Sequence, residues 1–167
     1  MTHSVKPHRI PRRAVPTNTA RQVNQYVRLL MQVNPALTIA QSRSIVTSLI
    51  AQCKESHVRV DWLLAMMWQE SHFVPTTVSV DGAVGLLQVL PSNAPAKNLF
   101  DASQNIRAGV GYFAYLLKQF HGSYYYATVA YNQGITNVLN GTFIDTYYFT
   151  VLSKNKSVKG ALFSASL

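Results

Sequence analysis

The sequence contains two glutamates, and their neighbours predict different chemistry for them. Glu55 follows Lys54 in a polar stretch, whereas Glu70 follows the apolar segment 62–68. Burial among apolar side chains disfavours a charged carboxylate and raises its pKa. A carboxyl group that stays protonated near neutral pH is able to act as a general acid. The local sequence leaves open the alternative that Glu70 is a partly exposed residue on a helix surface, without a catalytic role.

The helix expected to carry Glu70 begins near Asp61 and is apolar on all sides up to Gln69, which predicts a buried central helix. It must end before Pro75, because proline cannot continue a helix and disfavours helical backbone at Val74. Glu70 is therefore expected near the C-terminal end, where the helix dipole also disfavours a negative charge. The pattern predicts one acid presented at the end of a buried helix.

Apolar residues at helical spacing predict further helices around this one. They are expected to begin near Thr19, near Thr38, after Asp101 and at Tyr124, with a last one over about 145–154. Prolines and glycines interrupt residues 72–98, which predicts a loop region with a small β-hairpin and a short helical turn. The expected fold class is α+β, predominantly α-helical.

The length of 167 residues favours one domain. We expect residues 1–19 to form a basic, poorly ordered N-terminal arm, because prolines interrupt them, and residues 156–167 to form a C-terminal tail. The globular domain is then expected over residues 20–155.

Positive charge dominates the composition, with 15 Lys and Arg residues, six Asp and Glu residues and a formal net charge of +9. Such a balance favours an anionic partner, which for the N-terminal arm could be a wall polymer, a membrane surface or nucleic acid. The alternative is that the charge only keeps the protein soluble. The single cysteine, Cys53, permits no internal disulfide and is expected to be a small core residue.

Three motifs occur in order along the chain. Residues 70–91 read Glu-Ser-x-Phe-x-Pro and then Ser-x-x-Gly-Ala-x-Gly-Leu-x-Gln-x-x-Pro. Residues 98–109 contain Asn-Leu-Phe-Asp and then Asn-Ile-x-Ala-Gly, and residues 130–134 read Ala-Tyr-Asn-x-Gly. In this order and spacing the motifs resemble the soluble lytic transglycosylase family over about residues 58–152. The resemblance implies a lysozyme-like fold of the goose-type lysozyme and lytic transglycosylase kind.

The resemblance also implies functional positions. It makes Glu70 the catalytic acid/base, and it places Ser79 and Gln88 along the sugar-binding cleft. It places Tyr131 and Asn132 on a neighbouring helix that approaches the catalytic carboxyl. A late family tyrosine falls on Tyr147 or Tyr148, and Tyr147 is the candidate we name. The residues alone leave other roles open: the two amides could satisfy buried backbone groups, and Tyr131 could fill the core.

The activity implied by the resemblance is cleavage of the β-1,4 bond between N-acetylmuramic acid (MurNAc) and N-acetylglucosamine (GlcNAc) in peptidoglycan, with a 1,6-anhydro product. Protonated Glu70 would donate a proton to the bridging oxygen and then act as a base. No cofactor is expected, and the five histidines show no metal-ligand spacing. Two alternatives stay open: a hydrolytic muramidase like the goose-type lysozymes, in which Asp81 positions water, and a non-catalytic wall-binding or virion structural protein.

The setting expected from the sequence is the bacterial cell wall or periplasm. The N-terminus shows no signal-peptide pattern and no segment has the apolar length of a membrane span. Three routes to the wall fit this: a bacteriophage enzyme carried in the virion, a phage lysin released during host lysis, or a processed fragment of an exported protein. Of these we expect a phage route, and we expect a monomer.

Overall fold

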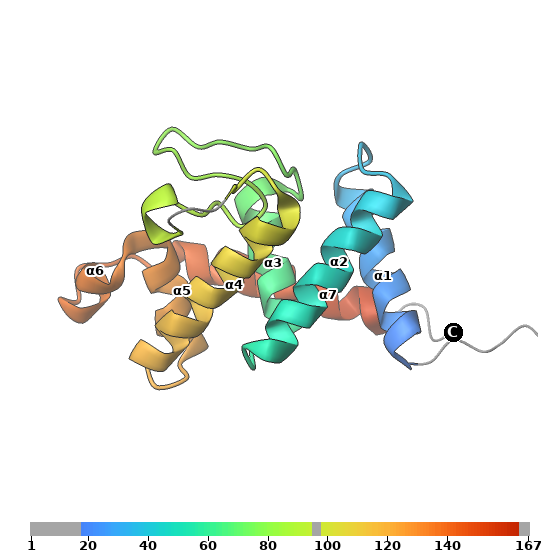
Figure 1. The fold of residues 1–167 in the computed structure, drawn as a ribbon. Helices are drawn as coiled ribbons and strands as arrows, with labels where there is room; N and C mark the ends of the chain where they lie inside the picture. The colour runs from blue at the N-terminus through green and yellow to red at the C-terminus, as the bar shows by residue number, and fades with distance from the viewer. Residues whose placement is uncertain (1–17, 95–97, 164–167) are drawn as a thin grey trace, which may run out of the picture.

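The computed structural model describes residues 18–94 and 98–163, which are predominantly helical. Their helices, drawn in Figure 1, are α1 (Asn18–Val33), α2 (Ile39–Glu55), α3 (Val60–Ser71), α4 (Ala102–Gln119), α5 (Tyr124–Gln133), α6 (Ile135–Leu139) and α7 (Thr146–Phe163), with one 3-10 turn, η1 (Pro91–Asn93). None of the described helices is long and apolar enough to cross a membrane. The predicted N-terminal arm lies outside the described residues, apart from the two that begin α1.

Helix α3 is the centre of the core, as its apolar sequence predicts. Leu63, Leu64, Met66 and Met67 are fully buried on this helix. Helix α7 runs behind α3 from α5 to α1, so that the last helix of the chain closes one side of the core (Figure 1). Cys53 on α2 is free and buried, which confirms that it is a core residue, and burial raises the pKa of its thiol to about 12. Glu70 therefore lies on α3, which has the largest share of buried residues among the described helices.

The prediction that the last helix ends near residue 154 is wrong, since α7 continues to Phe163. The added turns are held by contacts with distant helices. The Asn155 side chain donates to Asp61 Oδ2 at 3.1 Å, and Lys159 lies 3.6 Å from the same oxygen. Val158 is fully buried. These partners lie about a hundred residues away in sequence, so no local pattern indicates the extra length. The domain limits themselves stay a prediction.

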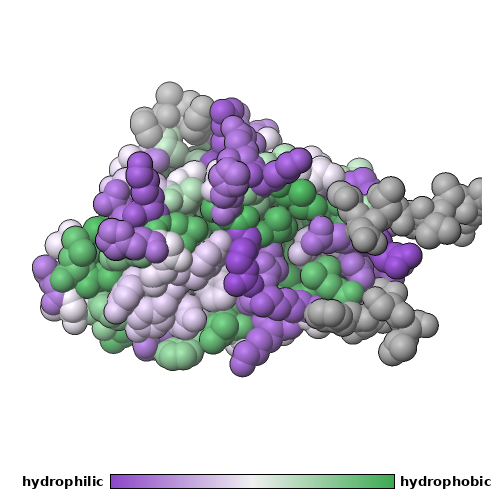
Figure 2. Space-filling view, turned by 90° about the horizontal axis from the view of Figure 1, so that it is seen from below, coloured by the Kyte–Doolittle hydropathy of each residue, from purple (hydrophilic) through white to green (hydrophobic). Residues whose placement is uncertain are grey.

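The predicted β-hairpin reduces to two isolated antiparallel bridges, Val78–Val84 and Val84–Val89, within the described part of the loop. The segments between turns are too short for a ladder, because Gly82 and Gly85 both have positive φ and turn the chain. The loop lies over the C-terminal end of α3 (Figure 1). On the opposite face of the molecule, hydrophobic and hydrophilic side chains are intermixed (Figure 2).

Candidate active site

Glu70 is the next-to-last residue of α3, where the helix dipole and burial act on it together. The helix ends when His72 adopts a left-handed conformation with φ 51°, and its N–H still donates to Trp68 O. Burial raises the pKa of the half-buried Glu70 from 4.5 to about 7, and a hydrogen bond from Tyr147 acts in the opposite direction. The predicted general acid thus has a pKa suited to donating a proton near neutral pH.

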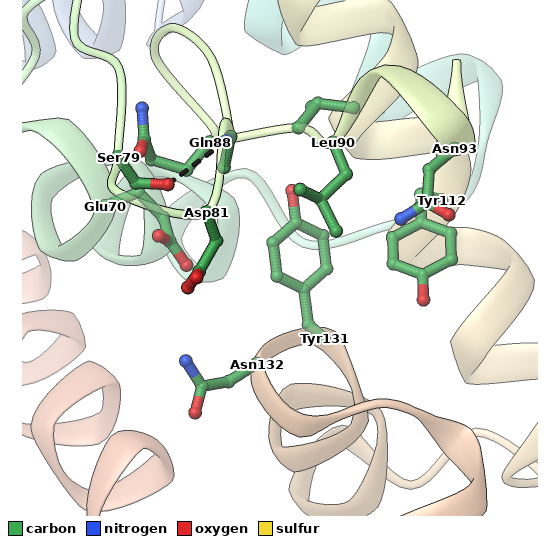
Figure 3. Close-up of a pocket in the computed structure, with 11 residues that line it drawn as sticks. Glu70, Ser79, Asp81, Gln88, Leu90, Asn93, Tyr112, Tyr131 and Asn132 are labelled. Atoms are coloured by element: carbon green, nitrogen blue, oxygen red, sulfur yellow. Dashed lines mark hydrogen bonds between the residues drawn. The ribbon is translucent and has the colours of Figure 1, made fainter. Parts of the chain in front are cut away.

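Glu70 faces a cavity of about 240 Å³. The lining comes from the end of α3, the loop after it, α4 and α5 (Figure 3). The lining residues are Glu70, Ser79, Asp81, Ala83, Gln88, Val89, Leu90, Asn93, Tyr112, Tyr131 and Asn132. Four of the five residues predicted to bind substrate therefore share one cavity with Glu70, and Tyr147 contacts Glu70 directly.

Tyr147 and Tyr148 point to different surroundings from α7. The Tyr147 hydroxyl donates a hydrogen bond to Glu70 Oε1. The Tyr148 ring packs against Trp62 at 5.7 Å and Tyr125 at 4.8 Å, measured between ring centroids. Burial and the charge of Glu70 raise the pKa of Tyr147 well above 10, so this hydroxyl stays a donor at working pH. Of the two tyrosines, Tyr147 is the one placed to orient the acid.

Tyr131 and Asn132 approach the cavity from the end of α5. The Tyr131 hydroxyl donates to Leu87 O at 2.7 Å, which ties α5 to the loop, and its ring lies 5.5 Å from that of Tyr112. The Asn132 side chain is exposed and forms no hydrogen bond with the described residues. Its amide points into the cavity, toward Glu70 (Figure 3). Tyr131 therefore has a structural contact as well as a place in the wall, whereas the Asn132 amide is available to a ligand.

Ser79 and Gln88 line the cavity and also hold the loop together. Ser79 Oγ accepts a hydrogen bond from Ala83 N at 3.0 Å (dashed in Figure 3). Gln88 Nε2 donates to Thr77 O at 3.1 Å and to Gly85 O at 2.9 Å. The Gln88 side-chain nitrogen thus has the alternative role given above, which is to satisfy backbone carbonyl groups. Its side-chain carbonyl accepts no hydrogen bond from the described residues and remains available.

The loop that carries these residues is held in place by hydrogen bonds to the side chain of Asn105 on α4. This amide is fully buried, donates to Val84 O at 2.7 Å and Leu99 O at 3.0 Å, and accepts from Leu87 N at 2.9 Å. Gly85 is required here, because an added Cβ would lie 2.4 Å from the Asn105 nitrogen. Gly85 also has a positive φ of 77°, so both the backbone conformation and the close approach favour glycine at this position.

Ser71, which follows Glu70, anchors the same loop to α3. Its buried hydroxyl donates to Leu86 O at 2.9 Å and lies 3.2 Å from Met67 O. The distance between the helix that holds the acid and the loop that holds its neighbours is therefore set by a residue adjacent to the acid itself.

Besides Asp81, which entered only as part of the hydrolytic alternative, five residues of the cavity wall were not among the predicted site residues: Ala83, Val89, Leu90, Asn93 and Tyr112. Tyr112 adjoins Phe113 of the apolar stripe on α4, so an aromatic residue at the edge of a buried face was the available signal. No sequence pattern indicated Leu90 and Asn93, because their position at the cavity depends on how an irregular loop is folded. Among the described residues, no group of three His, Cys, Asp or Glu side chains is placed to hold a metal ion.

Comparison with known proteins gives a family model, the transglycosylase SLT domain, that matches residues 47–142. Membrane-bound lytic murein transglycosylase F of Histophilus somni (strain 2336) is 33% identical over 92 residues, which are 48% of this chain and 19% of that protein. The protein of the same name from Pseudomonas syringae pv. syringae is 40% identical over 70 residues, which are 39% and 14% of the two chains. The matched part of the chain spans only between about a seventh and a fifth of the length of these curated relatives.

Solved structures share the fold. The 70 kDa soluble lytic transglycosylase of Escherichia coli superposes with a TM-score of 0.57 at 19% identity, over 84% of this chain and 27% of that one. An inactive mutant of lytic transglycosylase Slt from Pseudomonas aeruginosa gives 0.55 at 24% identity, over 69% and 22%. The predicted lysozyme-like, predominantly helical fold is therefore confirmed.

Proposed function

Because this chain belongs to the transglycosylase SLT domain family, we propose that it cleaves the MurNAc-β-1,4-GlcNAc bond of peptidoglycan and forms a 1,6-anhydro-MurNAc end. The observation that carries the proposal is Glu70: a half-buried carboxyl with a pKa of about 7, hydrogen-bonded by Tyr147, facing a polar cavity. The relatives named above are lytic murein transglycosylases, and this supports the same substrate here.

The proposed reaction uses one carboxyl group twice. Protonated Glu70 donates its proton to the bridging oxygen, and the bond from that oxygen to the muramyl C1 breaks. The substrate's own 2-acetamido group stabilises the positive centre at C1. The Glu70 carboxylate then removes the proton from the C6 hydroxyl, whose oxygen bonds to C1 and closes the anhydro ring. An internal nucleophile is effective because well-oriented groups reach effective molarities on the order of 10⁵ M or more.

The polar residues around Glu70 have separate proposed roles. Tyr147 orients the carboxyl and stabilises it once the proton has left, because its hydroxyl donates to Oε1. Asn132 and the side-chain carbonyl of Gln88 are proposed to bind sugar hydroxyl and acetamido groups, and Ser79 and Tyr131 to shape the wall beside them. The reaction needs no metal or cofactor, which stays a prediction.

The pH dependence of cleavage should follow the protonation of Glu70. The acid must be protonated in the free enzyme, so kcat/KM should be highest below pH 7 and fall as pH rises through about 7. Replacing Tyr147 by Phe removes a hydrogen bond that lowers this pKa, so the falling limb should move to higher pH. Turbidity clearance of purified cell walls, measured across pH, gives the position of the falling limb in the wild type and in Tyr147→Phe. A Tyr148→Phe control should leave the limb in place, and an unmoved limb in Tyr147→Phe would contradict the assigned contact.

A hydrolytic muramidase is the second candidate function, because Asp81 lines the same cavity as Glu70. In Figure 3 the two carboxylates lie on the same side of Tyr131 and point into the cavity. Asp81 is exposed, however, and it forms no hydrogen bond with the described residues that would hold it against an attacking water.

Product mass distinguishes the two reactions. We expect anhydro ends from the wild-type protein and from Asp81→Asn, with a change in rate of less than about tenfold in the variant, well below the effect of losing a general acid or base. Mass spectrometry of digested cell wall measures this. Reducing-end products heavier by one water, lost together with activity in Asp81→Asn, would establish the hydrolytic reaction instead.

The proposed place of action is the cell wall in the periplasm, which follows from the substrate. The relatives named above are bacterial proteins and do not support a bacteriophage origin. The phage setting, virion association, the monomeric state and binding of wall polymer, membrane or nucleic acid by residues 1–19 therefore stay predictions. The alternative that the protein is a non-catalytic wall-binding protein also stays open, and the Glu70→Gln variant tests it.

A further inference from the structure

A second cavity continues the catalytic one along α4. It measures about 390 Å³ and shares two wall residues, Asn93 and Tyr112, with the catalytic cavity. Figure 3 shows both residues beyond Tyr131 as seen from Glu70. The rest of the wall consists of Ala94, Arg107, Ala108, Gly111 and Tyr115. A polymer that passes Glu70 and Tyr131 in this direction reaches the second cavity next.

The wall of this second cavity has the composition of a binding surface. The Tyr112 and Tyr115 rings stack with centroids 6.3 Å apart and an angle of 22° between their planes. Tyr115 is 48% exposed, so much of its surface is accessible to a ligand. Beside them Gly111 leaves open space, since an added Cβ would meet no atom within 4 Å. Aromatic walls with a few placed polar groups are typical of ligand sites.

The two cavities have opposite charge. The catalytic cavity contains the carboxyl groups of Glu70 and Asp81 and no basic residue. The second cavity contains Arg107 and no acidic residue. The Arg107 side chain is exposed and forms no ion pair or hydrogen bond with the described residues. A guanidinium group suits a planar carboxylate, to which it donates two parallel hydrogen bonds. An anionic substituent on the substrate is therefore disfavoured near Glu70 and favoured near Arg107.

We propose that the Arg107 cavity binds a carboxylate carried by the substrate strand, and that it thereby selects anionic strands and sets their register. The inference rests on the proposed function, because that function supplies the strand. Each muramic acid bears a lactyl group, which either holds a peptide stem with free carboxylates or ends in a carboxylate itself once the stem is removed. The proposed ligand is this carboxylate, from either source.

The test measures binding without turnover. The full chain carrying Glu70→Gln is titrated calorimetrically with peptide-bearing strands, with amidase-stripped strands that keep the lactyl carboxylate, and with neutral chitohexaose. We expect one or both anionic strands to bind more tightly than chitohexaose. Adding Arg107→Gln should weaken anionic binding by roughly fivefold, the effect of an exposed ion pair, and leave chitohexaose unchanged. The anionic strand that loses affinity identifies the source of the carboxylate.

Arg28→Gln, made in the same background, is the matched control. It removes the same side chain and charge from an exposed position on α1, away from both cavities, and should change none of the three affinities. Three results would each overturn the proposal. Arg107→Gln could weaken chitohexaose binding as much as anionic binding, it could weaken the binding of no strand, or Arg28→Gln could weaken anionic binding as much as Arg107→Gln does. Cleavage by the wild-type chain is scored separately: binding selected by Arg107 without any cleavage would refute the proposed function and retain this inference.

Discussion

Replacing Glu70 by Gln should reduce the rate of cell-wall cleavage by on the order of 10³-fold or more, because the amide neither donates an acidic proton nor accepts one. Among the described residues that line the cavity or contact Glu70, none is placed to replace this acid. Asp81 lines the same cavity but is exposed, and the Tyr147 hydroxyl has a pKa well above 10 because burial and Glu70 both raise it. Release of soluble muropeptides from purified sacculi measures the loss, and unchanged clearance by the variant would refute the role of Glu70.

The matched control is Glu55→Gln, which changes the chain's other glutamate. Glu55 is exposed at the C-terminal end of α2 and lines neither the catalytic cavity nor the Arg107 cavity. The control enzyme should retain full activity. Loss of activity in both variants would point to an effect of net charge on wall binding rather than to catalysis, because each variant removes one negative charge.

Stability against pH separates lost chemistry from lost folding. The Glu70 pKa is raised from 4.5 to about 7 in the folded protein, so folding favours the protonated form. The resulting stability is fully present below about pH 4.5 and is lost as pH rises through about 7. The amide has no such dependence. The Glu70→Gln variant should therefore gain stability relative to wild type between those pH values, and remain at least as stable at pH 8. Urea denaturation at pH 4.5 and pH 8 checks this.

Local patterns in the sequence accounted for the features that depend on neighbouring residues. The apolar run on α3 and the proline after it placed Glu70 near the end of a buried helix, and Asp101 capped α4 through a 2.8 Å hydrogen bond from Gln104 N. Features that depend on distant segments were not accessible in this way. The contact of Tyr147 with Glu70 joins residues 77 positions apart, and it exists only because α7 crosses α3. The resemblance suggested a tyrosine, and only the packing of α7 distinguished Tyr147 from Tyr148.

The Asn105 contacts show the same limit within one motif. The sequence placed this residue in a block that resembles the family, but it gave no partners for the amide. In the fold the amide binds three backbone groups of two different segments, 84–87 and 99. It therefore couples α4 to the loop that carries the cavity wall. The predicted hairpin is reduced to two isolated bridges, because side-chain contacts rather than a strand ladder hold most of this loop.

Asn105→Ala should consequently destabilise the protein by on the order of 3–5 kcal/mol, because it leaves the buried Leu87 N–H and the Leu99 carbonyl without partners. It also removes one of the two hydrogen bonds that the Val84 carbonyl accepts. Urea denaturation at constant pH measures the change in the free energy of unfolding. Asn137→Ala is the control, since that exposed amide bonds only Gln133 O within its own chain segment, and it should cost less than about 1 kcal/mol. Equal costs in the two variants would contradict the anchoring role.

The same variant also tests whether the loop anchor serves the site. Leu87 receives a hydrogen bond at its carbonyl from Tyr131 and donates its N–H to Asn105, so one residue links α4, the loop and α5. Removing the Asn105 side chain should let the segment that positions Gln88 move. The rate of cleavage per folded molecule of Asn105→Ala should therefore fall, even at temperatures where the variant is still native. Full activity per folded molecule would show that the remaining contacts, among them those of Tyr131 and Ser71, are enough to fix the cavity wall, and that Asn105 serves only the stability of the fold.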